Sequence, residues 1–121
     1  MNDLLEKSFD FGVRLTELAG WLKDEGKPFP LIGQLLECGA GICVSLRISN
    51  DMPLIRRESY AQAFQQSEEA EYLLEMMVKV GCLTELQSRP LLSDCRFIKE
   101  GIMTLKKERK RQGRRDPGKA L

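Results

Sequence analysis

The sequence predicts an all-α fold in which four helices form an antiparallel, up-down-up-down bundle. Four segments carry apolar residues every three or four positions, and no stretch alternates apolar and polar residues as a half-buried strand would. Short connections join these segments, which favours antiparallel neighbours. The chain has 121 residues, 42% of them hydrophobic and 31% charged, so its size and composition suit one globular domain.

The first two predicted helices are separated by a polar stretch with stop signals. The apolar seam of the first helix repeats at steps of four, three and four, which is the spacing of a bundle seam: Phe11, Leu15, Leu18 and Leu22. Gly26 and Pro28 within residues 23–28 should end this helix. The second helix opens at Phe29-Pro30, continues through apolar positions to Ile48, and closes within residues 49–53.

The third and fourth predicted helices complete the bundle. The third covers about residues 53–80, and at about 28 residues it would extend roughly 40 Å and be the longest in the molecule. Gly81 is a natural C-cap for it. The fourth should begin at Ser88 or Arg89, with Pro90 in its first turn. Its seam follows an unbroken 4-3-4-3 pattern: Leu91, Cys95, Ile98, Ile102 and Leu105.

Charge divides the chain into an acidic body and a basic tail. Residues 106–121 contain eight basic and two acidic residues, a net charge of +6, whereas residues 1–105 contain 11 basic and 16 acidic residues, a net charge of −5. The apolar stripe also stops at Leu105. We therefore predict a four-helix bundle domain over residues 1–105 and a basic, partly disordered tail over residues 106–121, whose first part could prolong the last helix.

Several classes of function are disfavoured by what the sequence lacks. It has no histidine, which excludes Ser-His-Asp and Cys-His catalysis and histidine-ligated metals. The four cysteines lack Cys-x-x-Cys spacing, so they suit small buried hydrophobes in a reducing compartment better than a zinc site: Cys38, Cys43, Cys82 and Cys95. No signal-peptide pattern and no apolar run of bilayer length are evident. We expect a cytoplasmic protein that is not an enzyme and has no metal or cofactor.

Two features inside the predicted helices are open to alternative interpretations. Gly39 and Gly41 lie mid-helix, where each costs about 1 kcal/mol relative to alanine. Close helix packing or a kink explains them better than a phosphate-binding loop, which needs glycines just before a helix N-terminus. The third helix carries an acidic group that suits a solvated face better than a di-iron site, because histidine is absent: Glu68, Glu69, Glu71 and Glu75. Of these, Glu69 could hydrogen-bond across the core.

The candidate phosphate contacts are cations on the second and third helices and in the tail. Isolated surface arginines are usually only solvated, and basic tails also serve as solubility or linker segments. Eight cations in sixteen residues can nevertheless neutralise several phosphates, with an affinity that falls steeply with salt. The tail lacks aromatic residues for base stacking, so backbone and shape recognition is expected. The predicted nucleic-acid-binding residues are Arg47, Arg56, Arg57, Lys106, Lys107, Arg109, Lys110, Arg111, Arg114 and Arg115.

Three stretches resemble one family of small bacterial proteins. They are Lys7-Ser8-Phe9-Asp10-Phe11, Leu35-Leu36-Glu37-Cys38-Gly39-Ala40-Gly41-Ile42, and Glu69-Ala70-Glu71-Tyr72-Leu73-Leu74 running to Gly81-Cys82-Leu83. The family comprises the four helix bundle proteins encoded in intervening sequences of large-subunit ribosomal RNA genes and the related accessory variability proteins of diversity-generating retroelements. The similarity covers about residues 6–105.

The resemblance implies a four-helix bundle that assembles into a ring-like homopentamer. In the retroelement branch it further implies a basic pentamer that binds RNA and a reverse transcriptase. This chain departs from the family on the second helix, where Ser45 replaces an asparagine and Arg47 a glutamate. A polar contact from this helix to Glu69 or Tyr72 should therefore be weakened or rearranged, and positive charge is gained.

These observations together predict a non-enzymatic, oligomeric accessory protein that binds structured RNA or an RNA–DNA hybrid, with a reverse transcriptase as partner. The alternative is an assembly or protein-binding module of the intervening-sequence type that does not bind nucleic acid. In that case the small residues of the second helix and the apolar excess of the third, Met76, Met77, Val78 and Val80, would serve only subunit contacts.

Overall fold

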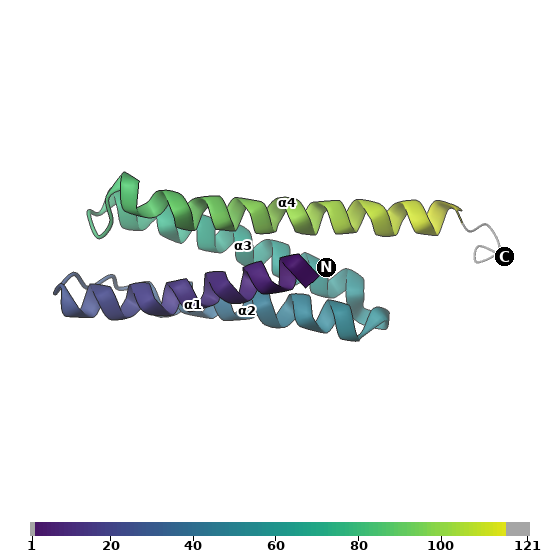
Figure 1. Ribbon diagram of the computed structural model, residues 1–121, viewed down its shortest axis with the longest axis horizontal. Coiled ribbons are helices and arrows are strands. Elements are labelled where there is room, and N and C mark those ends of the chain that lie inside the picture. Colours follow the sequence, from purple (N-terminus) through teal and green to yellow (C-terminus); the bar gives the residue numbers. More distant parts are fainter. Residues whose placement is uncertain (1, 116–121) are drawn as a thin grey trace.

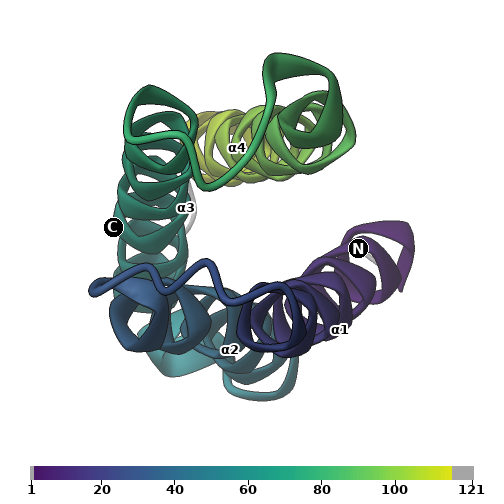
Figure 2. The same cartoon turned by 90° about the vertical axis from the view of Figure 1, so that its left-hand side faces the viewer.

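The computed structural model describes the backbone of residues 2–115 and the side chains of residues 3–111. The described residues form four α-helices and one 3-10 turn: α1 (Asn2–Asp24), α2 (Ile32–Asp51), η1 (Pro53–Ile55), α3 (Arg56–Lys79) and α4 (Glu85–Arg115). The helices alternate in direction along one long axis (Figure 1). Seen end on, they follow one another around the bundle in chain order (Figure 2). The prediction of an all-α chain with four sequentially packed helices is confirmed.

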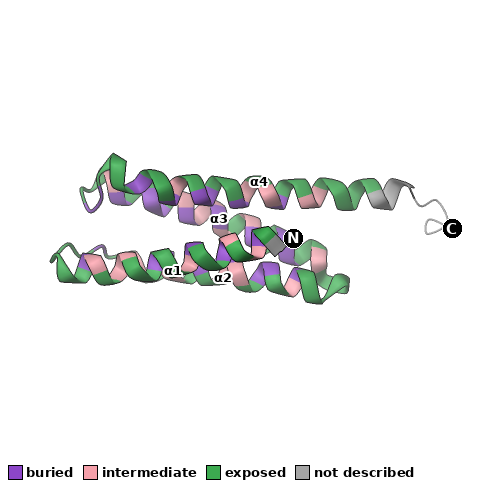
Figure 3. Ribbon diagram, in the orientation of Figure 1, coloured by how far each residue is buried: buried purple, intermediate pink, exposed green. Residues whose placement is uncertain are grey.

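The predicted seams form the core. Buried residues line the inner faces of the helices, and exposed residues cover the outer faces and the projecting end of α4 (Figure 3). Leu18 packs against the edge of this core. Gly81 follows α3 with a φ of +84° and donates its N–H to the Val78 carbonyl, so the predicted C-cap is also confirmed. The largest fully buried hydrophobic side chains are Phe11, Leu15, Leu35, Ile42, Leu46, Leu74, Met77, Ile98 and Ile102.

Two predicted helix boundaries were wrong. Pro53–Ile55 forms a 3-10 turn, so α3 begins at Arg56 and has 24 residues, whereas α4 has 31 and is the longest described helix. α4 begins at Glu85 because Thr84 and Gln87 form a reciprocal capping box: the Gln87 N–H donates to Thr84 Oγ1 at 3.1 Å and the Thr84 N–H donates to Gln87 Oε1 at 2.9 Å. Pro90 therefore lies inside α4 and not in its first turn.

The glycines of α2 serve close packing, as predicted. A β-carbon at Gly39 would lie 2.7 Å from Leu15 Cδ1 and 3.6 Å from the α-carbon of Gly12, so the backbones of α1 and α2 approach closely there. Gly41 faces α3, and a β-carbon at this position would overlap the side-chain amide of Gln66. Both glycines lie mid-helix and not at a helix N-terminus, so neither belongs to a phosphate-binding loop.

Alanine at these two glycines is expected to change stability in opposite directions. Gly39→Ala should lower the free energy of unfolding by about 1–2 kcal/mol, because the added methyl group would push the fully buried Leu15 side chain out of its packed position in the core. Gly41→Ala should be neutral or stabilising by up to about 1 kcal/mol, because helix propensity improves and the half-buried Gln66 side chain can rotate away, giving up only a long hydrogen bond from Ser45. Urea unfolding of both variants measures the difference. Equal effects would contradict this account of α2.

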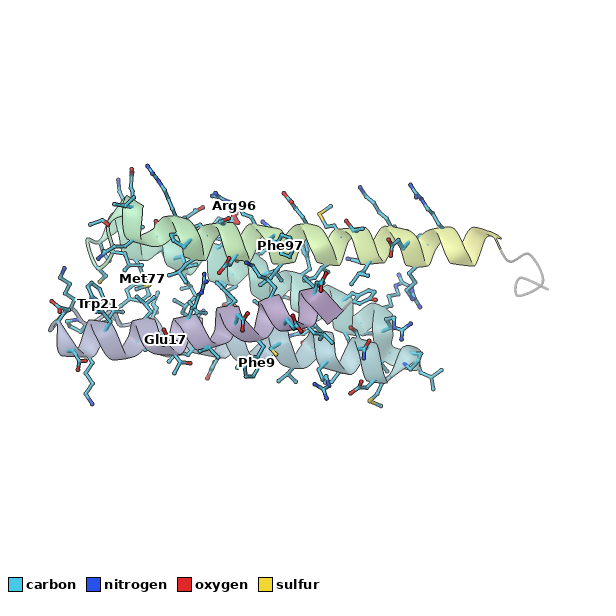
Figure 4. The ribbon with its side chains drawn as sticks, viewed as in Figure 1. Phe9, Glu17, Trp21, Met77, Arg96 and Phe97 are labelled. Carbon is cyan, nitrogen blue, oxygen red and sulfur yellow. The ribbon has the colours of Figure 1, made fainter. Side chains whose placement is uncertain are left out.

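The bundle closes where α1 meets α4. Asp94, only 7% exposed, lies between Lys7 Nζ at 2.9 Å and Arg14 Nη1 at 2.7 Å. The Lys7 ammonium also lies 5.6 Å from the ring centre of Phe97, which is labelled on α4 in Figure 4. Leu4 packs over Gly101, where a β-carbon would lie 2.9 Å from Leu4 Cδ1. These contacts tie the first half of α1 to α4.

Among the described helices, α2 is long and apolar enough to cross a membrane by length and composition, with a mean hydropathy of 1.2 over 18 residues. This differs from the expectation that the chain has no apolar run of bilayer length. In the structure α2 packs against both α1 and α3 and supplies three of the largest fully buried side chains, Leu35, Ile42 and Leu46, together with the buried Cys38. Its hydropathy is that of a core helix in a bundle.

Candidate nucleic-acid interface

α4 continues beyond the bundle as a basic helix. Its apolar face ends at Leu105, yet the helix runs to Arg115 and passes through Gly113. Figure 1 shows this end projecting past the other helices. The first part of the predicted tail therefore prolongs α4, and the predicted boundary at Leu105 falls within a continuous helix. The rest of the tail that was predicted to be partly disordered, residues 116–121, lies outside the described residues, as do the side chains of Arg114 and Arg115.

Four predicted site residues line one hollow between the start of α3 and the end of α4. Its volume is about 270 Å³, and it is lined by one residue from the first turn of α3, three from α4 and a buried tyrosine: Arg57, Lys106, Arg109, Lys110 and Tyr60. The three α4 residues have i, i+3, i+4 spacing, which places them on one helix face. The structure thus brings Arg57 to cations that lie about fifty positions away in the sequence.

Two aromatic residues of α3, Tyr60 and Phe64, lie beside these cations. The Lys106 ammonium lies 5.7 Å from the ring centre of Phe64, within range of a cation–π interaction. Tyr60 is only 5% exposed, and burial raises the pKa of its hydroxyl, an effect that the Arg56 and Arg109 charges partly oppose. The hydroxyl is therefore a neutral hydrogen-bond donor at neutral pH.

Arg56 and Arg57 are adjacent but have different surroundings. Arg56 is half-buried and its Nε donates to the Ser49 carbonyl oxygen at 2.7 Å, so it ties the start of α3 to the last turns of α2. Arg57 is exposed and lines the hollow. Arg56 therefore has a structural contact of its own, whereas Arg57 remains available to a ligand.

The other predicted basic residues lie elsewhere. Arg47 is exposed, pairs with Asp51 at 3.3 Å, and lines a separate hollow of about 620 Å³ between α1 and α2. That hollow is mostly apolar, and its lining includes Phe9, which Figure 4 shows on the side of α1 away from α4. Lys107 and Arg111 are exposed on α4 but do not line the basic hollow.

The acidic residues of α3 are engaged with neighbouring helices. Glu68 and Glu71 both contact Lys99 of α4, and Glu71 Oε2 lies 3.5 Å from Lys99 Nζ and 3.6 Å from Arg96 Nε. These pairs hold α3 against α4. Glu75 is exposed. Within the part of the chain that the structure describes, no group of three or more potential metal-ligand side chains gathers.

Glu69 makes the contact across helices that its position suggested. It accepts hydrogen bonds from Gln34 Nε2 at 2.7 Å and from Cys38 Sγ at 3.2 Å, and both bonds lower the pKa of its carboxyl. Burial and the Glu69 hydrogen bond raise the pKa of the Cys38 thiol to about 12. Tyr72 is exposed and Ser45 instead donates to Gln66 Oε1 at 3.3 Å. The polar contacts from α2 to α3 thus reach Glu69 and Gln66.

Tyr60 and Phe64 were not among the predicted site residues, because the prediction considered cations alone. A signal was present: Arg57, Tyr60 and Phe64 have i, i+3, i+7 spacing, which places the arginine on the same helix face as the two rings. The i, i+3, i+4 spacing of the α4 cations was the matching signal on the other helix.

Comparisons with known proteins support the fold. No family model and no curated protein matches the chain. The crystal structure of a protein of unknown function from the S23 ribosomal protein family of Bacteroides thetaiotaomicron superposes with a TM-score of 0.79, at 24% identity, over 84% of this chain and 96% of that one. The chain shares this protein's fold. The match supports the four-helix fold that the resemblance implied.

Proposed function

We propose that this protein is a non-enzymatic, cytoplasmic accessory protein that binds structured RNA or an RNA–DNA hybrid through the basic end of α4 and the adjoining start of α3. The supporting observation is the convergence of Arg57, Lys106, Arg109 and Lys110 on one hollow. Within the described side chains, residues 3–111, none of these four cations is in an ion pair with a carboxylate. Their charge is therefore available to an external anion.

The chemistry of this surface suits the nucleic-acid backbone. Phosphates that meet lysine and arginine release condensed counterions, which makes binding strong at low salt and weak at high salt. The rings beside the cations cannot stack on bases, because Tyr60 is buried and Phe64 is covered by Lys99 and Lys106, which lie 6.0 and 5.7 Å from its ring centre. Recognition should follow the shape and charge of the nucleic acid more than its base sequence.

The proposal includes assembly into a homo-oligomer, with a ring of five as the resemblance implies, and a reverse transcriptase as partner. Five copies of a tail with a net charge of +6 would present one strongly positive surface, so weak contacts would add up to avidity. The apolar hollow between α1 and α2 supports a role in assembly, because Phe9 at 61% and Val44 at 56% exposure leave apolar surface uncovered. The same surface favours the second candidate function, an assembly module without nucleic-acid affinity.

Fluorescence anisotropy with a labelled structured RNA across a salt series tests the proposal. The full chain should bind with a steep negative salt slope, and a chain ending at Leu105 should lose most of both affinity and slope, because it lacks the α4 cations that follow Leu105, including Lys106, Arg109 and Lys110. Absence of binding by either form at low salt would overturn the proposal and leave the assembly module. Light scattering gives the subunit number, and a mass near 13.8 kDa at micromolar concentration would contradict the pentamer.

A further inference from the structure

The basic hollow carries more positive charge than one backbone phosphate requires. Four cations surround a space of about 270 Å³, which is smaller than most pockets for drug-sized ligands. Arg57 stands in the first turn of α3, where the helix dipole adds further positive potential. A phosphodiester brings one negative charge, whereas a phosphate monoester brings about 1.5 to 2 at neutral pH. The charge of the hollow therefore matches a monoester better.

The walls of the hollow also suit a phosphate more than a base or a sugar. Arg57 and Arg109 present guanidinium groups, which bind phosphate oxygens through paired N–H donors. Lys106 and Lys110 add ammonium donors, and Lys106 is positioned by the Phe64 ring. The Tyr60 hydroxyl supplies a neutral donor, while its buried ring offers no face to an aromatic base. Every lining residue thus supplies a donor, and none is a carboxylate.

We propose that this hollow is a binding site for a phosphate monoester, the group present at the 5′ end of a nucleic-acid strand and on a free nucleotide. The inference rests on the proposed function, because it assigns the end of the bound strand to a particular place on the protein. The strand would then follow the exposed cations of α4, with Lys107 and Arg111 beside its backbone phosphates.

Two RNA hairpins of the same sequence test the inference, one with a 5′-hydroxyl and one with a 5′-monophosphate. The full chain should bind the phosphorylated hairpin about tenfold more tightly, because one or two charge-assisted hydrogen bonds are added. A nucleoside 5′-monophosphate should compete more strongly with the phosphorylated hairpin than the unphosphorylated nucleoside does. The gain in affinity that the phosphate brings can be compared between nucleoside and mononucleotide, and between the two hairpins. A larger gain for the mononucleotide would assign the site to a free nucleotide instead of a strand end.

A matched pair of variants locates the effect. Arg109→Gln removes a cation that lines the hollow, whereas Arg111→Gln removes an exposed cation two positions away that does not. Arg109→Gln should reduce the preference for the phosphorylated hairpin to nearly onefold, while Arg111→Gln should weaken both hairpins equally and keep the preference. Circular dichroism melting confirms that both variants remain folded.

The outcomes separate this inference from the proposed function. Equal affinity for the two hairpins, with a steep salt slope retained, would overturn the monoester site but support RNA binding. Competition or direct binding by the mononucleotide without any RNA binding would support the monoester site and overturn the proposed function. Failure of both ligands to bind at low salt would overturn both.

Discussion

Replacing Arg57 with glutamate is expected to stabilise the bundle and, at the same time, to weaken RNA binding. Arg57 is exposed in the first turn of α3, where a positive charge opposes the helix dipole, and it faces three cations of α4. A glutamate would favour the dipole and could pair with those cations. We expect a gain of a few tenths to about 1 kcal/mol in the free energy of unfolding, because exposed pairs are weakened by solvent.

RNA binding should move in the opposite direction. Arg57→Glu removes one phosphate contact and adds a repulsive charge at the hollow, so the salt slope should fall by about 2 and the affinity by roughly tenfold to a hundredfold. Thermal unfolding and anisotropy on the same preparation measure the two effects. Arg89→Glu is the matched control, because Arg89 is an exposed arginine of α4 that does not line the hollow, and its RNA affinity should be unchanged. If the Arg57→Glu variant binds RNA as tightly as the unchanged protein, the hollow is not part of the RNA interface.

Opposed effects on stability and binding are characteristic of a functional site. Four like charges around one hollow repel one another and contribute nothing to the core, so folding alone does not explain their arrangement. Asp94 is different, because this buried carboxylate forms ion pairs with Lys7 and Arg14. These pairs hold α1 against α4. The bundle balances charge where helices must be held together and leaves it unbalanced at the projecting end of α4.

The helical seams could be predicted because apolar periodicity reflects burial directly. The seam residues Phe11, Leu15 and Ile98 are all buried, as their spacing indicated. The helix starts were less predictable because local hydrogen bonds determine them. The Thr84–Gln87 capping box makes α4 begin at Glu85, before the predicted start at Ser88 or Arg89. The pattern Thr-x-x-Gln was visible in the sequence, but the prediction placed it before the helix.

The candidate site could be predicted only in part. The charge of residues 106–115 is evident from the sequence, but the convergence of Arg57 with this segment depends on the antiparallel packing of α3 against α4. The composition of a segment also does not show which of two neighbouring arginines faces a ligand and which contacts another helix. Successive residues of a helix point about 100° apart, so Arg56 contacts the end of α2 while Arg57 faces α4.

Replacing Phe11 with alanine is expected to cause the largest loss of stability. Phe11 is fully buried in α1, between Leu4 and Arg14, which both contact α4. Removing a buried aromatic ring typically costs about 3–5 kcal/mol, because contacts are lost and the cavity collapses only partly. Domains of this size have a total stability of roughly 5–15 kcal/mol, so the variant should be close to unfolding at physiological temperature.

Urea unfolding followed by circular dichroism measures this loss. Val13→Ala is the control on the same helix, because Val13 is 40% exposed and its truncation should cost less than about 0.5 kcal/mol. A loss below about 1 kcal/mol for Phe11→Ala would contradict the core described for α1. The measurement at two protein concentrations also bears on assembly, because the midpoint of a homo-oligomer rises with concentration and that of a monomer does not. If subunits support α1 through the apolar hollow beside it, dilution should enlarge the effect of Phe11→Ala.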